Sequence, residues 1–133
     1  MMQVQVSTTF IGEDKFEVTT PVPGVKIYVD KKKETGVPAG QNPLELFLSA
    51  LSGCIGVYAK NYLARHEITF KKLKIQASAE LSEDHPIRLV NIKARIETDA
   101  DLKDKKDVFL KFVHNCPVHN TVLNTKEVDI QLV

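Results

Sequence analysis

Hydrophobic and polar residues alternate along several stretches of this chain, and such alternation predicts β-strands. The longest alternation runs from Leu73 to Leu81, and a second, from Val90 to Ile96, follows after a polar turn. Each segment has one apolar and one polar face, which predicts an antiparallel hairpin with one buried side. Shorter strands are expected nearer the two ends of the chain, at Met2–Val6, Phe16–Val18, Val25–Val29 and Val128–Leu132.

A long helix is predicted between the short strands and the hairpin. Asn42 suits the N-cap and Pro43 the first helical position, so the helix begins there and extends to about Arg65. Its middle is apolar nearly all round, which is typical of a buried helix. A stripe of mostly small residues runs along one side, at Ser49, Ser52, Gly53, Gly56 and Lys60. Such a stripe lets another backbone approach closely, and the same helix of a second subunit is the natural neighbour.

Two further helices are predicted in the last third of the chain. Asp99 or Asp101 is expected to cap the first of them. The dipeptide Cys116-Pro117 interrupts this helix, because the residue before a proline avoids helical backbone angles, and a short helix then continues through Leu123. The order of strands and helices predicts an α+β fold, with residues 1–133 in a single domain.

Charge and composition exclude several classes of function. The formal net charge is +1, so no overall positive field recruits nucleic acid or an acidic membrane surface. The first residues lack the basic start and apolar core of a signal peptide. The longest apolar stretch, Leu44 to Ala59, contains polar residues and falls short of the roughly 20 residues that a membrane span requires. We therefore expect a cytoplasmic protein that binds neither nucleic acid nor membrane.

The chain contains two cysteines, Cys54 and Cys116, and in a reducing compartment two thiols favour a redox cycle over a permanent disulfide. Cys54 lies in the middle of the long helix, directly after Gly53. Cys116 precedes Pro117, and a proline that opens a helix leaves the preceding residue at the N-cap. Free backbone N–H groups there stabilise a thiolate and make it more reactive. The alternative is that each cysteine is a small, inert residue of the core.

The second cysteine also raises the question of a metal site. His114, Cys116 and His119 lie close together in the sequence, and zinc binds such side chains. A structural zinc site takes four ligands, and the fourth would have to come from a distant part of the chain. We therefore predict no metal site, and the residues imply no cofactor.

Two motifs are specific when they are taken together. The first runs from Asn42-Pro43-Leu44-Glu45-Leu46-Phe47 to Ser52-Gly53-Cys54, and the second is Cys116-Pro117-Val118-His119-Asn120, followed by the terminal alternation. With both in place, the chain resembles the OsmC/Ohr family of thiol-dependent peroxidases, and the order of predicted elements agrees over essentially the whole chain. The resemblance implies an OsmC-like fold, in which antiparallel sheets wrap around the long central helices of an intertwined homodimer.

The resemblance also implies a two-cysteine cycle. Cys54 would attack the O–O bond of an organic hydroperoxide, and Cys116 would resolve the resulting sulfenic acid as a disulfide. An external dithiol would then restore both thiols. The apolar side chains of Phe47, Leu51 and Tyr58 would form a pocket for small hydrophobic hydroperoxides.

The chain departs from the family pattern at two charged positions. The family usually has a glutamate directly after Asn-Pro, where this chain has Leu44, and Glu45 follows one place later. The family's peroxidases also stabilise the thiolate with an arginine from the first strands. Here no arginine precedes Arg65, and Lys15 is the nearest candidate. Glu45 and Lys15 are therefore the expected supporting residues.

Two other functions are compatible with these residues. The missing arginine and the displaced glutamate also suit a non-catalytic dimer, whose apolar cleft holds a small hydrophobic ligand. The thiols of such a protein would be unreactive at neutral pH, and the ligand would raise its thermal stability. In the other alternative, a thiol-disulfide reductase, small disulfides rather than peroxides oxidise the two thiols.

Overall fold

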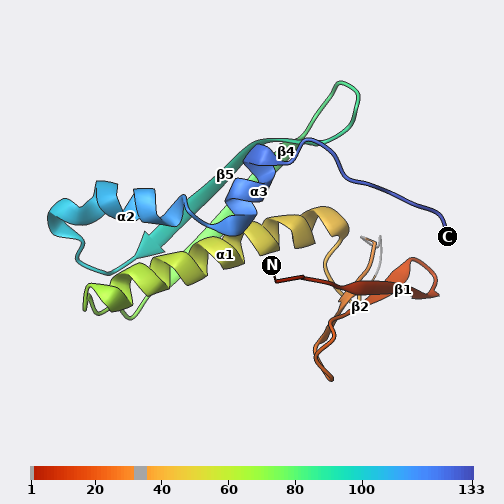
Figure 1. Ribbon diagram of the computed structural model, residues 1–133, viewed down its shortest axis with the longest axis horizontal. Coiled ribbons are helices and arrows are strands. Elements are labelled where there is room, and N and C mark those ends of the chain that lie inside the picture. Colours follow the sequence, from red (N-terminus) through yellow and green to blue (C-terminus); the bar gives the residue numbers. More distant parts are fainter. Residues whose placement is uncertain (1, 32–35) are drawn as a thin grey trace. The chain divides into compact units, whose positions relative to one another are not determined.

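The computed structural model describes residues 2–31 and 36–133. The chain divides into two compact units, Met1–Phe47 and Leu48–Val133, and the boundary falls inside the long helix. The chain runs from three short strands through the long helix and a hairpin to two shorter helices (Figure 1). Antiparallel strands together with helices confirm the predicted α+β class.

The first unit is a three-stranded antiparallel sheet with the order β1–β2–β3. Its strands are β1 (Ser7–Gly12), β2 (Lys15–Thr19) and β3 (Lys26–Val29). The turn between β1 and β2 requires positive φ angles, 115° at Gly12 and 53° at Glu13, and glycine adopts such an angle without a steric penalty. Phe10 lies opposite Phe16 across the two strands, with ring centroids 5.5 Å apart, and this aromatic pair stabilises the register.

The first strand begins later than the alternation predicts. We expected a strand at Met2–Val6, whereas β1 begins at Ser7 and the described residues 2–6 are exposed and irregular. The reason is the length of the partner strand, because Thr19, the last residue of β2, pairs with Ser7. Backbone groups beyond that pair meet no further residue of β2, and alternation alone does not make a strand.

The segment between β3 and the long helix is mostly irregular, as predicted, although residues 32–35 lie outside the described range. Asp30 is almost fully buried, with 1% of its surface exposed, and its Oδ2 accepts the N–H of Ala39 at 2.8 Å. The N–H of Asp30 donates to the carbonyl of Gln41 at 3.1 Å. These two bonds close the loop and return the chain to the end of β3, directly before the helix begins.

The long helix α1 (Pro43–Arg65) begins at the predicted position. Asn42 Oδ1 accepts the N–H of Glu45 at 2.9 Å, and Glu45 Oε1 accepts the N–H of Asn42 at 3.0 Å. This reciprocal pair of hydrogen bonds is a capping box. It provides acceptors for the N–H of Glu45, which the first turn of a helix leaves free, and for the N–H of the N-cap residue Asn42. Arg65 lies in the last turn, where a positive charge suits the negative end of the helix dipole.

The second unit contains the predicted hairpin, formed by β4 (Leu73–Leu81) and β5 (Leu89–Thr98) in antiparallel register. The two strands lie alongside α1 (Figure 1). The register shifts once near the turn, where Asn91 has a φ of 52°, and this bulge bends β5 locally. The hairpin side chains that pack against the buried cluster on the helix include Leu73, Ile75, Ile92 and Ile96.

Two helices follow the hairpin. A turn of 3-10 helix, η1 (Lys103–Lys105), leads into α2 (Lys106–Val113), and α3 (Pro117–Asn124) comes last. The predicted cap of the second helix is wrong, because Lys105 rather than Asp99 or Asp101 occupies the N-cap of α2. Asp99 instead accepts the N–H groups of Lys71 and Lys72, at 3.0 and 2.9 Å, where β4 begins. The carboxylate of Asp99 is therefore bound to backbone N–H groups beside the strand and does not cap the helix.

The core of the second unit lies on one face of α1. Tyr62 is central to it, with its ring 5.3 Å from that of Phe109 and 5.6 Å from that of Phe112. Leu63 has no exposed surface. The buried apolar members of this cluster are Leu51, Ile55, Ala59, Tyr62, Leu63, Leu102, Phe109, Val113 and Cys116.

The opposite face of α1 is exposed, which corrects the prediction of a helix buried all round. Ala50, Gly53 and Val57 lie on this face, and a Cβ atom built on Gly53 meets no atom of the described residues within 4 Å. Gly56 faces the hairpin instead, where a Cβ atom would lie 3.5 Å from Ile75 Cγ1. The hairpin, α2 and α3 cover one side of the helix, so the apolar circumference of α1 exceeds what they bury.

The predicted terminal strand at Val128–Leu132 is wrong for this structure. The described residues 125–133 form no regular element, and Leu132 is fully exposed. A strand persists only where its N–H and C=O groups pair with a neighbouring strand. Apolar and polar residues do alternate in this segment, but it pairs with no strand among the described residues.

The capping box gives a prediction for stability. We expect Asn42→Ala to lower the free energy of unfolding by about 1 kcal/mol, because the N–H of Glu45 loses its acceptor. Glu45→Ala should also destabilise the protein, whereas Glu45→Gln keeps an oxygen for the N–H of Asn42 and serves as the matched control. Chemical denaturation followed by circular dichroism measures all three changes. Equal losses for Glu45→Gln and Glu45→Ala would contradict the capping role.

Candidate functional site

Cys116 occupies the N-cap of α3, as Pro117 predicts. Its side chain has no exposed surface, and its Sγ accepts the N–H of His119 at 3.5 Å. Its backbone carbonyl accepts the N–H of Asn120 at 3.0 Å, which is the first helical bond of α3. The residue therefore begins the helix and places a buried sulfur at the positive end of the helix dipole.

Cys54 comes from a different element, the middle of α1, and is half-buried. It packs against the core cluster of which Cys116 is a member. Both residues are free thiols. The fold thus brings together two cysteines that the sequence alone left far apart.

The surroundings of Cys54 disfavour its ionised form. Burial raises the pKa of the Cys54 thiol above its ordinary value, and the hydrogen bond with the Cys116 thiol raises it further. The N–H of Val118, in the first turn of α3, acts in the opposite direction and lowers this pKa. The net shift is upward, so the protonated thiol predominates at neutral pH and the reactive thiolate is a minor species.

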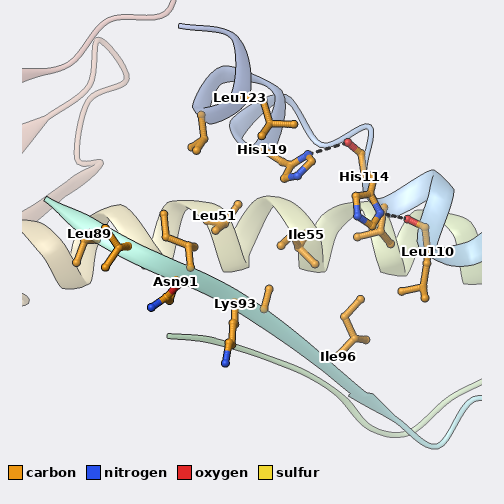
Figure 2. A pocket seen from close by; sticks show the side chains of 15 residues that line it. Leu51, Ile55, Leu89, Asn91, Lys93, Ile96, Leu110, His114, His119 and Leu123 are labelled. Carbon is orange, nitrogen blue, oxygen red and sulfur yellow. Dashed lines mark hydrogen bonds between the residues drawn. The ribbon is translucent and has the colours of Figure 1, made fainter. Parts of the chain in front are cut away.

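An apolar pocket of about 600 Å³ lies between α1, β5, α2 and α3. Leu51 and Ile55 line it from α1, Ile96 from β5 and Leu123 from α3, as Figure 2 shows. Its volume falls within the range of about 300–1,000 Å³ that is usual for small-molecule sites. The pocket can therefore hold an apolar group of modest size.

Two histidines form part of the pocket wall. His114 Nδ1 is 2.6 Å from the carbonyl oxygen of Leu110, and His119 Nδ1 is 3.1 Å from that of His114 (Figure 2). A carbonyl oxygen only accepts hydrogen bonds, so each Nδ1 carries the proton. These bonds fix both rings. The backbone N–H of His119 also contacts the Cys116 sulfur, so this residue lies between the pocket and Cys116, although neither cysteine lines the pocket.

The structure places the three predicted pocket residues in three different surroundings. Leu51 lines the pocket. Tyr58 packs against Phe112 with the two rings tilted and their centroids 5.6 Å apart, and Phe47 belongs to the first unit and is 40% exposed. Sequence reasoning did not single out Ile55, although its position one helical turn after Leu51 was an available signal.

The two predicted supporting residues lie in the first unit. Lys15 Nζ is 3.7 Å from Glu13 Oε2, and the carboxylate of Glu45 accepts the N–H of Asn42 in the capping box. These contacts are local and involve neither thiol. A role for Lys15 or Glu45 in the chemistry stays a prediction.

Sequence reasoning considered His119 only as a candidate zinc ligand and did not foresee that its backbone N–H contacts the Cys116 sulfur. The available signal was Pro117, because a helix that begins with proline has free N–H groups directly after it. What the sequence did not contain was the position of Cys54 relative to those groups.

The described residues form neither a metal-binding cluster nor a membrane-spanning helix. Among them, no three histidine, cysteine or acidic side chains gather closely enough to hold a metal ion. His114 and His119 contact each other through their rings instead, with centroids 5.2 Å apart. No helix in the described ranges combines the length and the apolar character needed to cross a membrane.

Comparison with known proteins agrees with this architecture. An uncharacterized protein of Methanocaldococcus jannaschii is 26% identical over 121 residues, which are 89% of this chain and 62% of the relative, so the chain spans about three fifths of that relative's length. An OsmC-like protein of Mycoplasma pneumoniae superposes with a TM-score of 0.79 at 22% identity, over 92% of this chain and 89% of the other.

A third comparison concerns a protein named for a function. An organic hydroperoxide resistance protein of Elizabethkingia anophelis superposes with a TM-score of 0.68 at 15% identity, over 93% of this chain and 91% of the other. At such identities the superpositions show a shared fold. The family model described as OsmC-like protein matches residues 33–131, which is most of the chain and includes both cysteines. The chain therefore belongs to the OsmC-like protein family.

Proposed function

We propose that this protein is a thiol-dependent peroxidase that reduces organic hydroperoxides. The observation that carries the proposal is the packing of two free thiols in one buried cluster, where Cys54 is half-buried and Cys116 is fully buried. The apolar pocket, whose wall includes His119 next to the Cys116 sulfur, supports an organic rather than an inorganic peroxide. Membership of a family in which some structural neighbours are named organic hydroperoxide resistance proteins supports the same assignment.

In the first step Cys54 gives its proton to solvent, and the thiolate attacks the terminal oxygen of the hydroperoxide R–O–O–H. A sulfur–oxygen bond forms while the O–O bond breaks, so Cys54 becomes a sulfenic acid. The electron pair of the O–O bond leaves with the alkoxide RO⁻, which takes up a proton and departs as the alcohol. Sulfur is oxidised by two electrons, and the peroxide is reduced by two.

In the second step Cys116 resolves the sulfenic acid. The Cys116 thiolate attacks the sulfur of Cys54, an S–S bond forms, and the hydroxide that leaves takes up a proton to become water. An external dithiol then reduces the disulfide by exchange and is itself oxidised to a disulfide. The cytoplasm, which keeps thiols reduced, suits such a cycle. No cofactor is needed, because the two sulfur atoms and the dithiol carry the electrons.

A homodimer is part of the proposal. Large apolar side chains are exposed in both units, with Phe10 60% and Ile130 88% exposed. The uncovered face of α1 around Gly53 is the place at which the helix of a second copy would pack, because small side chains permit a close approach. Within this proposal, Lys15 and Glu45 would play their supporting role in such a dimer.

A second candidate function is the binding of a small hydrophobic ligand without catalysis. The pocket of about 600 Å³ and the raised pKa of Cys54 favour it, since a protonated thiol is a poor nucleophile. The two functions differ in what peroxide does to the thiols. If cumene hydroperoxide leaves both thiols intact while an apolar ligand raises the melting temperature, the second function holds and the first fails.

The two cysteines are predicted to differ in what their replacement does. With cumene hydroperoxide, Cys54→Ser should abolish peroxide consumption, because the attacking sulfur is gone. Cys116→Ser should permit about one turnover and then leave a sulfenic acid on Cys54, which dimedone traps and mass spectrometry detects. Serine is a good N-cap residue, so Cys116→Ser keeps the start of α3. Peroxide consumption by Cys54→Ser at the rate of the parent protein would refute the assignment.

The first step is predicted to accelerate with pH. The pKa of Cys54 lies above its ordinary value, so the thiolate fraction rises about tenfold for each pH unit below that pKa and levels off above it. Single-turnover loss of the Cys54 thiol under excess peroxide, measured from pH 6 upward, should follow this curve. A rate that is already constant across neutral pH would show that the thiol is ionised there, contrary to its surroundings in this structure.

The dimer is predicted to depend on the small side chain at Gly53. A larger side chain fits within one chain, because a Cβ atom there meets nothing within 4 Å among the described residues, but it would keep a second helix away. We expect Gly53→Leu to weaken association about tenfold or more, since overpacking an interface costs about 1–3 kcal/mol. Gly53→Ala is the control and should still dimerise in sedimentation velocity experiments. A dimer equally stable in both variants would place the interface elsewhere.

A further inference from the structure

The wall of the apolar pocket is mostly hydrocarbon, and it is graded from buried to exposed. Leu51, Ile55 and Val113 form a buried floor, whereas Leu110 and Leu123 at the rim are 45% and 67% exposed. An apolar molecule can therefore enter from solvent between α2 and α3 and lie on the floor. Transfer of its apolar surface from water to this floor is favourable.

Two of the polar side chains in the wall are not available to a molecule on this floor. The amide of Asn91 donates to Glu80 Oε2 at 2.7 Å, in an exposed hydrogen bond between the two hairpin strands. Figure 2 shows the amino group of Lys93 pointing away from α1 and from the two histidines. The remaining polar side chains of the wall are those of His114 and His119.

His119 has one ring nitrogen that the protein itself does not use. Its Nδ1 donates to the carbonyl oxygen of His114 at 3.1 Å, so in the neutral ring Nε2 carries no proton and is an acceptor. Nε2 has no hydrogen-bond partner among the described residues. The side chain is half-buried, and its ring lies on the side of α3 that faces Leu51 and Ile55 (Figure 2). A molecule on the floor of the pocket therefore lies beside a ring with one unused acceptor.

His114 holds the ring of His119 in place. The two rings meet at 88°, with their centroids 5.2 Å apart, and the carbonyl of His114 accepts the proton on His119 Nδ1. These contacts fix both the orientation and the tautomer of His119. His114 is itself exposed, so its own Nε2 is open to water and discriminates less between ligands.

We propose that this pocket binds an uncharged apolar molecule with one O–H group, its hydrocarbon part on Leu51 and Ile55 and its hydroxyl donating to His119 Nε2. Alcohols and alkyl hydroperoxides share this chemistry. A carboxylate does not fit, because it has only acceptors and its charge would have to leave water for an apolar wall. The inference stands apart from the proposed function, since neither cysteine lines the pocket.

The first test compares two ligands that differ in one hydrogen-bond donor. 1-Octanol and methyl octyl ether have the same eight-carbon chain, but only the alcohol has an O–H. We expect the intact protein to bind 1-octanol about fivefold more tightly at pH 8, where an ordinary imidazole is neutral, because the ether leaves His119 Nε2 without a partner. Isothermal titration calorimetry measures both dissociation constants.

Three results of this titration would overturn the proposal. Equal affinities for the alcohol and the ether would show that no O–H is recognised. Tighter binding of octanoate than of 1-octanol would show that the pocket recognises a negative charge. Binding of neither the alcohol nor the ether would show that another part of the chain or a second copy covers the pocket.

The second test removes the acceptor. His119→Phe keeps an aromatic ring without Nε2, so it should weaken 1-octanol binding about fivefold, to the level of the ether, and leave the affinity for the ether unchanged. His85→Phe, the same change in the exposed turn between β4 and β5, is the matched control and should keep the preference for the alcohol. A folded His119→Phe protein that still prefers the alcohol fivefold would overturn the proposal.

A third measurement needs no substitution. In ¹⁵N-labelled protein, the Nε2 resonance of His119 should move further with 1-octanol than with the ether, because only the alcohol donates to this nitrogen. Equal movement with both ligands would place the hydroxyl elsewhere and overturn the proposal.

Octyl hydroperoxide separates the two sources of the O–H group. Its affinity is measured on Cys54→Ser, which should not consume it, beside that of 1-octanol on the same variant. Binding of either compound more tightly than the ether supports the proposal, and the tighter of the two is the ligand that the pocket suits. A parent protein that binds 1-octanol but consumes no cumene hydroperoxide refutes the proposed function and leaves this binding site intact.

Discussion

The buried contact between the first turn of α3 and the middle of α1 is the constraint on which the second unit depends. Cys116 begins α3 and has no exposed surface, because it belongs to the same apolar cluster as Leu63 and Val113. The cluster positions the start of α3 against α1, and with it the backbone donors of that first turn. The contacts that pack the core therefore also position the two thiols.

The burial of Cys54 at this contact opposes the reactivity proposed for its thiol. Removal of Cys54 from water stabilises the neutral thiol, whereas the reaction proposed for it requires the anion. The backbone N–H of Val118, in the first turn of α3, acts against burial by lowering the pKa of Cys54, although the net shift stays upward. The same turn contributes His119 both to the wall of the apolar pocket and to a hydrogen bond with the Cys116 sulfur.

The chain also has surfaces that its own elements do not cover. The sheet β1–β2–β3 exposes Phe10, α1 has an uncovered face around Gly53, and the terminal segment exposes Ile130. Apolar alternation in a segment without a strand partner, together with an apolar helix buried on one side, is what a chain that completes its fold with a second copy would show. The helical start at Asn42 and Glu45 needs no such partner, because its capping box is closed within four consecutive residues.

The sequence by itself determined the features that depend on local backbone chemistry. Asn42 and Pro43 defined the start of the long helix, Cys116 and Pro117 the start of the last one, and the alternation from Leu73 onward the hairpin. Capping, proline geometry and alternation act over a few residues, and a short window of sequence contains them whole.

Only the tertiary structure decided what depends on neighbours from elsewhere in the chain. Whether Met2–Val6 and Val128–Leu132 become strands depends on a partner edge, and which carboxylate caps a helix depends on competing donors, as Asp99 shows. The environment of Cys54 is of the same kind, because burial and the N–H of Val118 both come from packing. Desolvation and hydrogen bonding are properties of the assembled site, so the chemistry of a thiol cannot be deduced from its own segment of sequence.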